Sequence, residues 1–247
     1  MSALPARSVA PDPVTPPIAP AFAGRKPKVA YPERDGKPLA ETQAHLDQII
    51  YLLVALQQFF ASARDVFIAA DLLLYYEEGD PRQRVAPDVF VARGVPDAKR
   101  QRRTYLLWEE GAAPEVAFEI TSAGSRREDT VSKRTLYERL GVREYFLFDP
   151  LGEYLRPSLQ GHRLVGGAFE AMAPAGDGSL HSEALGLELR VRDGVLRLHD
   201  PLSGQWLLSP DEQVVARQEA EARAAAAEAE LARLRAQMEG RPAPFDC

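Results

Sequence analysis

Two acidic residues, Asp88 and Glu119, stand where the surrounding sequence predicts buried β-strands. Each lies in a short run rich in Val, Ile and Phe, which is VAPDVFVA for Asp88 and PEVAFEITS for Glu119. A carboxylate on a largely buried sheet costs free energy unless it is paired or binds a metal ion. Two carboxylates on adjacent strands can hold one or two hard cations such as Mg²⁺, which activate water and neutralise charge building on a phosphodiester.

A basic residue that suits the same chemistry follows the second of these strands. The charged stretch RREDTVSKRTLYERLG predicts a helix closed by Gly141, and on it Lys133 and Tyr137 lie four residues apart, so they share one face. A Lys near two carboxylates can stabilise a transition state or orient an attacking water. Each acid alone is a weak signal, because any strand can contain one. A far more specific signal than either acid alone is the ordered set Pro-Asp, Glu-Ile-Thr-Ser, Lys-x-x-x-Tyr and Gly-Val-x-Glu-Tyr.

The neighbouring segments predict the elements that position these residues. Period-two geometry in the second strand places Glu119 on one face with Ala117 and Thr121, opposite a face of larger apolar residues. The run REYFLFDP predicts a third strand. Residues 41–61 predict an amphipathic helix, because large apolar residues recur at spacings of three and four. The following DVFIAADLLLYY predicts one or two further strands.

Composition limits the class of protein. A chain of 247 residues suits one domain with appendages, and 45% hydrophobic with 27% charged residues is typical of a soluble globular protein. No apolar run approaches a membrane span and no secretory signal is visible, so we expect a cytoplasmic protein without membrane contact. The single Cys, at position 247, excludes an intramolecular disulfide and a Cys-rich zinc site. A net charge of −6 means that any nucleic-acid binding must use a local basic patch.

Changes in composition predict the domain organisation. Residues 1–30 are rich in proline and are expected to be disordered, and residues 31–208 form the main domain. Within it, residues 153–208 predict added antiparallel strands, with Arg-Asp-Gly at 192–194 as a hairpin turn. Residues 209–239, almost all Ala, Glu and Arg, predict a helix. This helix either pairs as a coiled coil, which would make a homodimer, or is solvated and frays, and residues 240–247 are expected to be disordered.

A basic cluster precedes the Glu119 strand and allows two interpretations. Residues 94–112 contain basic residues followed by two aromatic ones, which are Lys99, Arg100, Arg102, Arg103, Tyr105 and Trp108. Basic residues interleaved with aromatic ones can hold phosphates and stack on bases. The alternative is a solvated loop with two aromatic side chains in the core. The four histidines, His45, His162, His181 and His199, are scattered without metal-like spacing and are interpreted as surface or packing residues.

The ordered set of motifs resembles the Uma-two family of restriction endonucleases, a branch of the PD-(D/E)XK nuclease superfamily. The resemblance spans about residues 31–205 and includes YPERDGKPLAET, DLLLYYEEGDPRQRVAPDVFV, FEITSAGSRRED and LGVREYFLFDP. It implies an α/β, restriction-endonuclease-like αβββαβ core with a mixed central sheet, here followed by added C-terminal strands and a C-terminal helix. It also implies that Asp88 and Glu119 bind the metal together with the main-chain carbonyl of Ile120.

One departure from the superfamily motif concerns the catalytic Lys. The motif places Lys two positions after the second acid, whereas this chain has Thr121 there. The resemblance implies that Lys133 on the following helix supplies the missing cation, and that Glu41 on the first helix is a further acid. We therefore expect a DNA endonuclease that depends on Mg²⁺ or Mn²⁺, with Asp88, Glu119, Lys133 and Glu41 as catalytic residues. The alternative is a nuclease-like scaffold without activity that binds DNA or protein.

Overall fold

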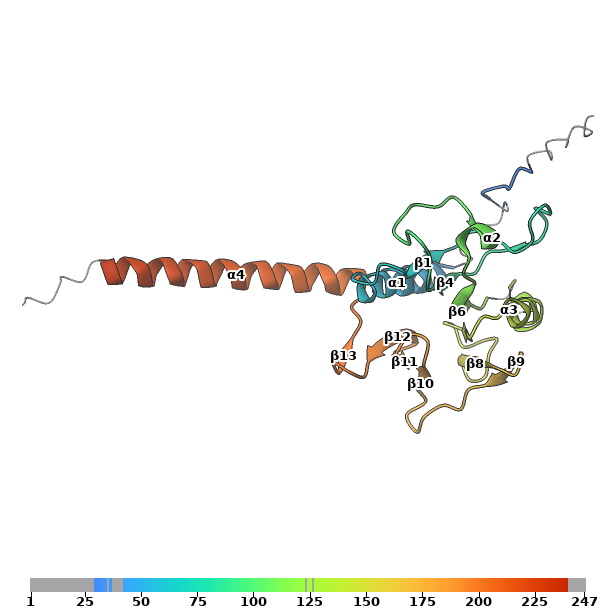
Figure 1. The fold of residues 1–247 in the computed structure, drawn as a ribbon. Coiled ribbons are helices and arrows are strands. Elements are labelled where there is room, and N and C mark those ends of the chain that lie inside the picture. Colours follow the sequence, from blue (N-terminus) through green and yellow to red (C-terminus); the bar gives the residue numbers. More distant parts are fainter. Residues whose placement is uncertain (1–28, 35, 37–41, 123, 126, 240–247) are drawn as a thin grey trace, which may run out of the picture.

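A six-stranded mixed sheet forms the centre of the molecule (Figure 1). The computed structural model describes residues 29–34, 36, 42–122, 124–125 and 127–239. In spatial order the strands are β1 (Phe67–Ala70), β4 (Val89–Ala92), β6 (Pro114–Ile120), β7 (Glu144–Phe148), β8 (Leu159–Val165) and β9 (Ala168–Ala171). All neighbours are antiparallel except β6 and β7.

The parallel pair requires a crossover, because two parallel strands cannot be joined by a tight turn. The crossover is helical and consists of η1 (Glu128–Lys133) and α3 (Arg134–Leu140). With α1 (Gln43–Phe59) before β1, the order α1, β1, β4, β6, α3 and β7 is the expected αβββαβ core. The predicted fold class is confirmed.

Helix α1 covers one face of the central sheet. It begins where Thr42 Oγ1 accepts a hydrogen bond from the His45 main-chain N at 3.2 Å, an N-terminal cap. Its buried side chains pack against the larger face of β6; the set includes Ile49, Leu52, Leu56, Val116, Phe118 and Ile120. The helix predicted for residues 41–61 is present and is two residues shorter at each end.

The opposite face of the sheet lies under the helical crossover. Tyr137 of α3 packs there with Ala117 of β6 and Tyr145 of β7, all fully buried. The alternation predicted for the Glu119 strand is therefore confirmed. Helix α3 ends at Gly141, whose φ of 76° is readily adopted only by glycine, as predicted. The first half of the crossover is a correction, because it is π-helical rather than α-helical.

Short elements between β1 and β6 form a second, three-stranded sheet. Its strands lie in the order β3 (Arg84–Val85), β2 (Leu74–Tyr75) and β5 (Tyr105–Leu106). The short helix α2 (Leu107–Glu110) follows β5. The segment predicted as one or two strands thus contains two, β1 in the central sheet and β2 in this small one.

The segment after β7 supplies further antiparallel strands. β8 and β9 extend the central sheet, and a separate four-stranded sheet contains β10 (Leu180–Ser182), β11 (Leu187–Arg192), β12 (Val195–Asp200) and β13 (Gln205–Trp206). The predicted hairpin joins β11 and β12 through Asp193 and Gly194, both with positive φ. The Gln48 side chain of α1 donates to the Leu196 carbonyl and accepts from its N–H, which fixes this sheet against α1.

The last element, α4 (Pro210–Glu239), extends away from the sheets (Figure 1). Ser209 and Glu212 form a reciprocal cap: the Glu212 N–H donates to Ser209 Oγ and the Ser209 N–H to Glu212 Oε2. Arg197 of β12 pairs with Glu212 at 2.7 Å, so the first turn is fixed to the sheet. Within the described part of the chain, no helix is long and apolar enough to cross a membrane. Residues 1–28 and 240–247, for which disorder is predicted, lie outside the described residues.

Candidate active site

Asp88 lies immediately before β4, not inside the strand as the sequence had suggested. Val89 is paired with Phe118, and this antiparallel register brings Asp88 opposite Glu119 on the face covered by the crossover. The Ile120 main-chain N donates to Asp88 Oδ2 at 2.6 Å, which fixes the carboxylate against the end of β6. The Asp88 side chain is 18% exposed, so the site opens to solvent at this point.

The Ile120 main-chain carbonyl faces the same side as Asp88. In a β-strand the N–H and C=O of one residue leave the same edge, and the Ile120 N–H points to Asp88. The Ile120 side chain is instead buried in the core beneath α1. The group that Ile120 can offer to the site is therefore its main-chain oxygen.

Glu119 is buried and receives two hydrogen bonds from the crossover. Lys133 Nζ donates to Glu119 Oε2 at 2.6 Å, and Tyr137 Oη donates to Glu119 Oε1 at 2.7 Å. Lys133 is the last residue of η1 and Tyr137 lies four residues later in α3, so both project from one helical face, as predicted. The buried acid is thus paired in the way that its position on the sheet required.

A third carboxylate, Asp129, belongs to the site and was not among the residues predicted from the sequence. It is fully buried, accepts from Ser125 Oγ at 2.6 Å and lies 3.3 Å from Lys133 Nζ. Its main-chain carbonyl accepts from Tyr145 Oη, which ties η1 to β7. The signal that would have found it is the spacing of four residues between Asp129 and Lys133 in a helical stretch.

Burial and mutual repulsion perturb these groups. Burial raises the pKa of Glu119 well above its usual range, the positive charge of Lys133 opposes the rise, and the negative charges of Asp88 and Asp129 add to it. Burial also raises the pKa of Asp129, and the positive charge of Lys133 again opposes the rise. For Lys133 burial favours the neutral amine, but Glu119 and Asp129 outweigh it, so the pKa of Lys133 is raised and it remains an ammonium.

The donor set fits a divalent cation. Glu119 and Asp129 share the ammonium of Lys133, and Asp88 contacts His45, so the three ionised carboxylates outnumber the cationic groups beside them. Among the described residues, buried Asp129 Oδ1 accepts no hydrogen bond. No group of three or more His, Cys, Asp or Glu side chains in the described chain forms a ready-made metal cluster. A site of two acids and one main-chain oxygen is consistent with that finding, and hard cations prefer such oxygen ligands.

Three other residues bear on the predicted site. Thr121, at the position where the superfamily has Lys, is buried on the Glu119 face, and its Oγ1 has no hydrogen-bond partner among the described residues. Glu41 lies outside the described residues. His45 corrects the interpretation of the histidines: it is buried, and its Nε2 lies 3.3 Å from Asp88 Oδ2.

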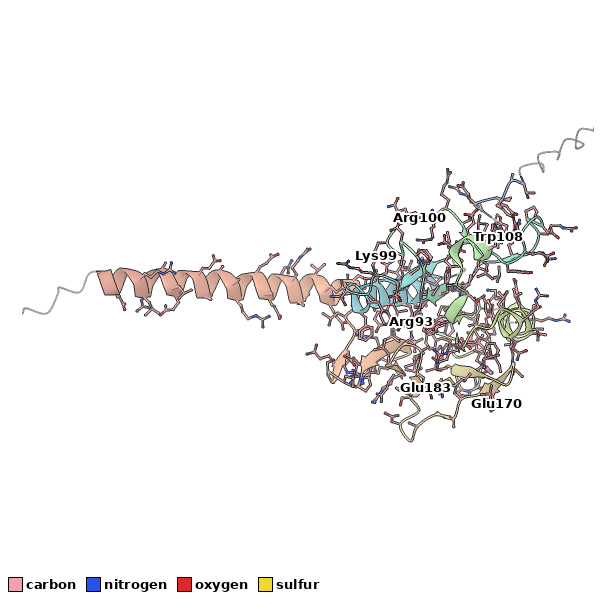
Figure 2. All side chains as sticks on the ribbon, viewed as in Figure 1. Arg93, Lys99, Arg100, Trp108, Glu170 and Glu183 are labelled. Atoms are coloured by element: carbon pink, nitrogen blue, oxygen red, sulfur yellow. The ribbon has the colours of Figure 1, made fainter. Side chains whose placement is uncertain are left out.

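The basic cluster at 94–112 is mostly neutralised by acids of the chain itself. Arg100 and Arg102 both bind Glu110, and Arg103 binds Glu33. Of the two aromatic residues, Tyr105 is fully buried and Trp108 packs against Tyr31. Figure 2 shows Lys99, Arg100 and Trp108 at one side of the molecule, in the region of this loop. These contacts favour the alternative of a solvated loop with aromatic side chains in the core, although only Tyr105 is in the core and Trp108 is half-buried.

The fold and the cluster of acids define a nuclease-like α/β protein. A family model described as "Uma2: Putative restriction endonuclease" matches residues 19–192, so the chain belongs to the Uma2 (Uma-two) family. Among solved structures, the chain is similar to a "putative nuclease" from Anabaena variabilis. The sequence identity is 15%, the TM-score is 0.45, and the match covers 64% of this chain and 87% of that chain. No curated protein sequence matches this chain.

Proposed function

We propose that this protein is a metal-dependent DNA endonuclease that hydrolyses phosphodiester bonds with Asp88, Glu119 and Lys133. The observation that carries the proposal is the 2.6 Å contact between Lys133 Nζ and Glu119 Oε2, on the face that Asp88 also occupies. An ammonium next to the two acids is the arrangement that the superfamily motif achieves with a Lys at the position of Thr121. Membership of the Uma2 family supports DNA as the substrate.

Asp88, Glu119 and the Ile120 carbonyl would hold a Mg²⁺ or Mn²⁺ ion. When bound, such an ion lowers the pKa of water and neutralises charge that develops on the phosphate. Lys133 is an ammonium, so it can stabilise negative charge on the phosphate as the bond to the leaving oxygen breaks. Tyr137 and Asp129 act as positioning residues, because the first fixes Glu119 and the second fixes Lys133. His45 orients the Asp88 carboxylate in the same way.

One observation favours the alternative of a scaffold without activity. Both carboxylate oxygens of Glu119 are already bonded, to Lys133 and to Tyr137. A closed pair of this kind also occurs where a buried acid has only a structural role. In that case the protein would bind DNA or protein without cleaving it.

Cleavage assays with matched variants test the proposal. Supercoiled and single-stranded DNA are incubated with wild type, Asp88→Ala and Asp177→Asn in Mg²⁺, in Mn²⁺ and in a chelator. Asp177 is an exposed acid that pairs with Arg190 outside the site, so its variant is the control. We expect metal-dependent cleavage by wild type and Asp177→Asn and none by Asp88→Ala. No cleavage by wild type with any metal, together with intact DNA binding, would support the scaffold instead.

A further inference from the structure

A cavity of about 390 Å³ opens beside Lys133, between the helical crossover and the segment that carries Tyr76 and Arg84. One wall comes from the segment that includes β2 and β3, with Tyr76, Gln83 and Arg84, and the other from η1 and α3, with Ser132, Lys133 and Arg139. The volume lies in the range of pockets that bind small molecules, which is about 300–1,000 Å³. Lys133 links the two regions, because it lines this cavity and also binds Glu119.

The cavity carries positive charge that the protein does not neutralise. Among the described residues, Arg84 and Arg139 form no ion pair with a carboxylate. Arg84 donates to the Pro81 carbonyl at 3.0 Å, and the Arg139 guanidinium lies 5.3 Å from the centre of the Tyr76 ring. Both contacts hold a guanidinium in place and leave its charge available for an anion. Glu128 is the single acidic residue in the described lining.

The basic loop at 94–112 differs from this cavity in its charge balance. A larger cavity of about 630 Å³ runs along β1 beside Lys99, Arg100 and Arg102. There the two arginines are held by Glu110, and Arg102 is bound through two nitrogens. An anion would have to compete with this buried carboxylate. A protein with a net charge of −6 needs a local cationic surface for a nucleic acid, and the Arg84–Arg139 cavity supplies one next to the acids.

We propose that Arg84 and Arg139 bind a backbone phosphate of the DNA substrate, next to the phosphate that reacts at Asp88, Glu119 and Lys133. This inference rests on the proposed nuclease function and adds the residues that position its substrate. Arginine suits the role because its planar guanidinium donates two parallel hydrogen bonds to phosphate oxygens. The two arginines come from opposite walls of the cavity, so a phosphate between them would fix the direction of the strand relative to Lys133.

The salt dependence of DNA binding tests this inference. Binding of a short fluorescent DNA is measured by anisotropy in a chelator, where no cleavage occurs, over a range of salt concentrations. The test variant is Arg84→Gln/Arg139→Gln, and Arg84→Lys/Arg139→Lys retains the charge. The control is Arg82→Ala/Arg103→Ala, which removes the same charge from exposed arginines outside the cavity lining. Thermal melting verifies that each variant is folded.

We expect the glutamine variant to bind roughly 10-fold or more weakly and to have a salt slope smaller by about one to two units. The lysine variant is expected to keep most of the affinity, and the control to remain close to wild type. Equal affinity and slope in wild type and the glutamine variant, an equal loss in the control, or no DNA binding by wild type would overturn the inference. If wild type cleaves DNA with Mn²⁺ and the glutamine variant has the DNA affinity and salt slope of wild type, this phosphate site alone is refuted. If the salt slope of the glutamine variant is smaller but wild type does not cleave DNA, the nuclease function is refuted and the phosphate site is retained.

Discussion

Lys133 Nζ lies 2.6 Å from Glu119 Oε2, although Lys133 ends η1 in the helical crossover and Glu119 lies in the strand before it. In the superfamily motif, a Lys two residues after the second acid supplies the ammonium. In this chain Lys133 brings an ammonium to that acid, Glu119, from the following helix. It also neutralises part of the charge of a carboxylate that is 1% exposed. The same pair therefore has consequences for both stability and chemistry, and the two can be measured separately.

Removal of Lys133 is expected to destabilise the fold. Lys133→Met leaves the buried carboxylates of Glu119 and Asp129 without their shared cation, which costs about 3–5 kcal/mol at neutral pH. The folded-state pKa of Glu119 then rises further above its unfolded value, so the penalty shrinks as the pH falls and the acid binds a proton. Urea unfolding at pH 7.5 and pH 5.5 measures the effect. The double variant Lys133→Met/Glu119→Gln serves as the control and should recover part of the loss; a neutral effect of Lys133→Met at both pH values would argue against the buried pair.

Metal binding is expected to stabilise the protein through Asp88. Mg²⁺ or Mn²⁺ at about 100 times its dissociation constant should raise the Tm by roughly 5–10 °C, because the ion relieves repulsion between the acids. Asp88→Asn is nearly equal in volume and should be neutral or stabilising without metal, yet lose this response. Asp177→Asn should keep it. Differential scanning fluorimetry measures all three proteins, and an identical shift in wild type and Asp88→Asn would end the metal-site proposal.

The sequence was sufficient to predict the parts of the site that depend on local periodicity. Alternation along β6 gave the face of Glu119, and the spacing of Lys133 and Tyr137 gave two side chains on one helical face. Gly141 marked the end of the helix because its backbone conformation is left-handed. These features depend on residues that are close together in the chain.

The features that the sequence did not reveal depend on contacts between distant segments. His45 and Asp88 are 43 residues apart, and no spacing rule relates them. The arginines of the basic cluster are neutralised by Glu33 and Glu110, which propensity cannot indicate. Asp129 lies at a local spacing of four residues from Lys133, but its place beneath β7 depends on Tyr145, whose Oη donates to the Asp129 main-chain carbonyl.

Acid should weaken the fold through His162. Its side chain is buried beside Tyr145 and Phe169, and burial lowers its pKa, with the charge of Arg134 acting in the same direction. The unfolded chain binds a proton near pH 6.5, so the stability that neutral His162 contributes is lost as the pH falls from there towards the folded pKa. The fall in unfolding free energy between pH 7.5 and pH 5 should be smaller in His162→Phe than in wild type. The exposed His181→Asn is the control, and an unchanged fall in His162→Phe would contradict the prediction.

We propose that the main domain ends near residue 209 and that α4 is an appendage. Deletion of residues 210–247 should leave a folded domain, because the side chains of α4 lie mostly on the exposed surface. The expected loss is about 1 kcal/mol or less, from the Arg197–Glu212 pair. Thermal melting and sedimentation of both proteins measure stability and self-association. Dissociation on truncation would support the coiled-coil dimer, whereas an insoluble product would place the boundary elsewhere.

The cleavage rate of Lys133→Met, alone and combined with Thr121→Lys, tests the central claim most directly. If Lys133 replaces the Lys that is absent at position 121, its loss should lower the rate by roughly 10²–10³, the effect of removing one electrostatic stabiliser. DNA affinity should fall only modestly, since one contact is a small part of a phosphate interface. Alternation along the chain places position 121 on the Glu119 face, so Thr121→Lys in the Lys133→Met background should restore part of the activity. Full activity of a folded Lys133→Met protein would contradict the account and remove Lys133 from the mechanism.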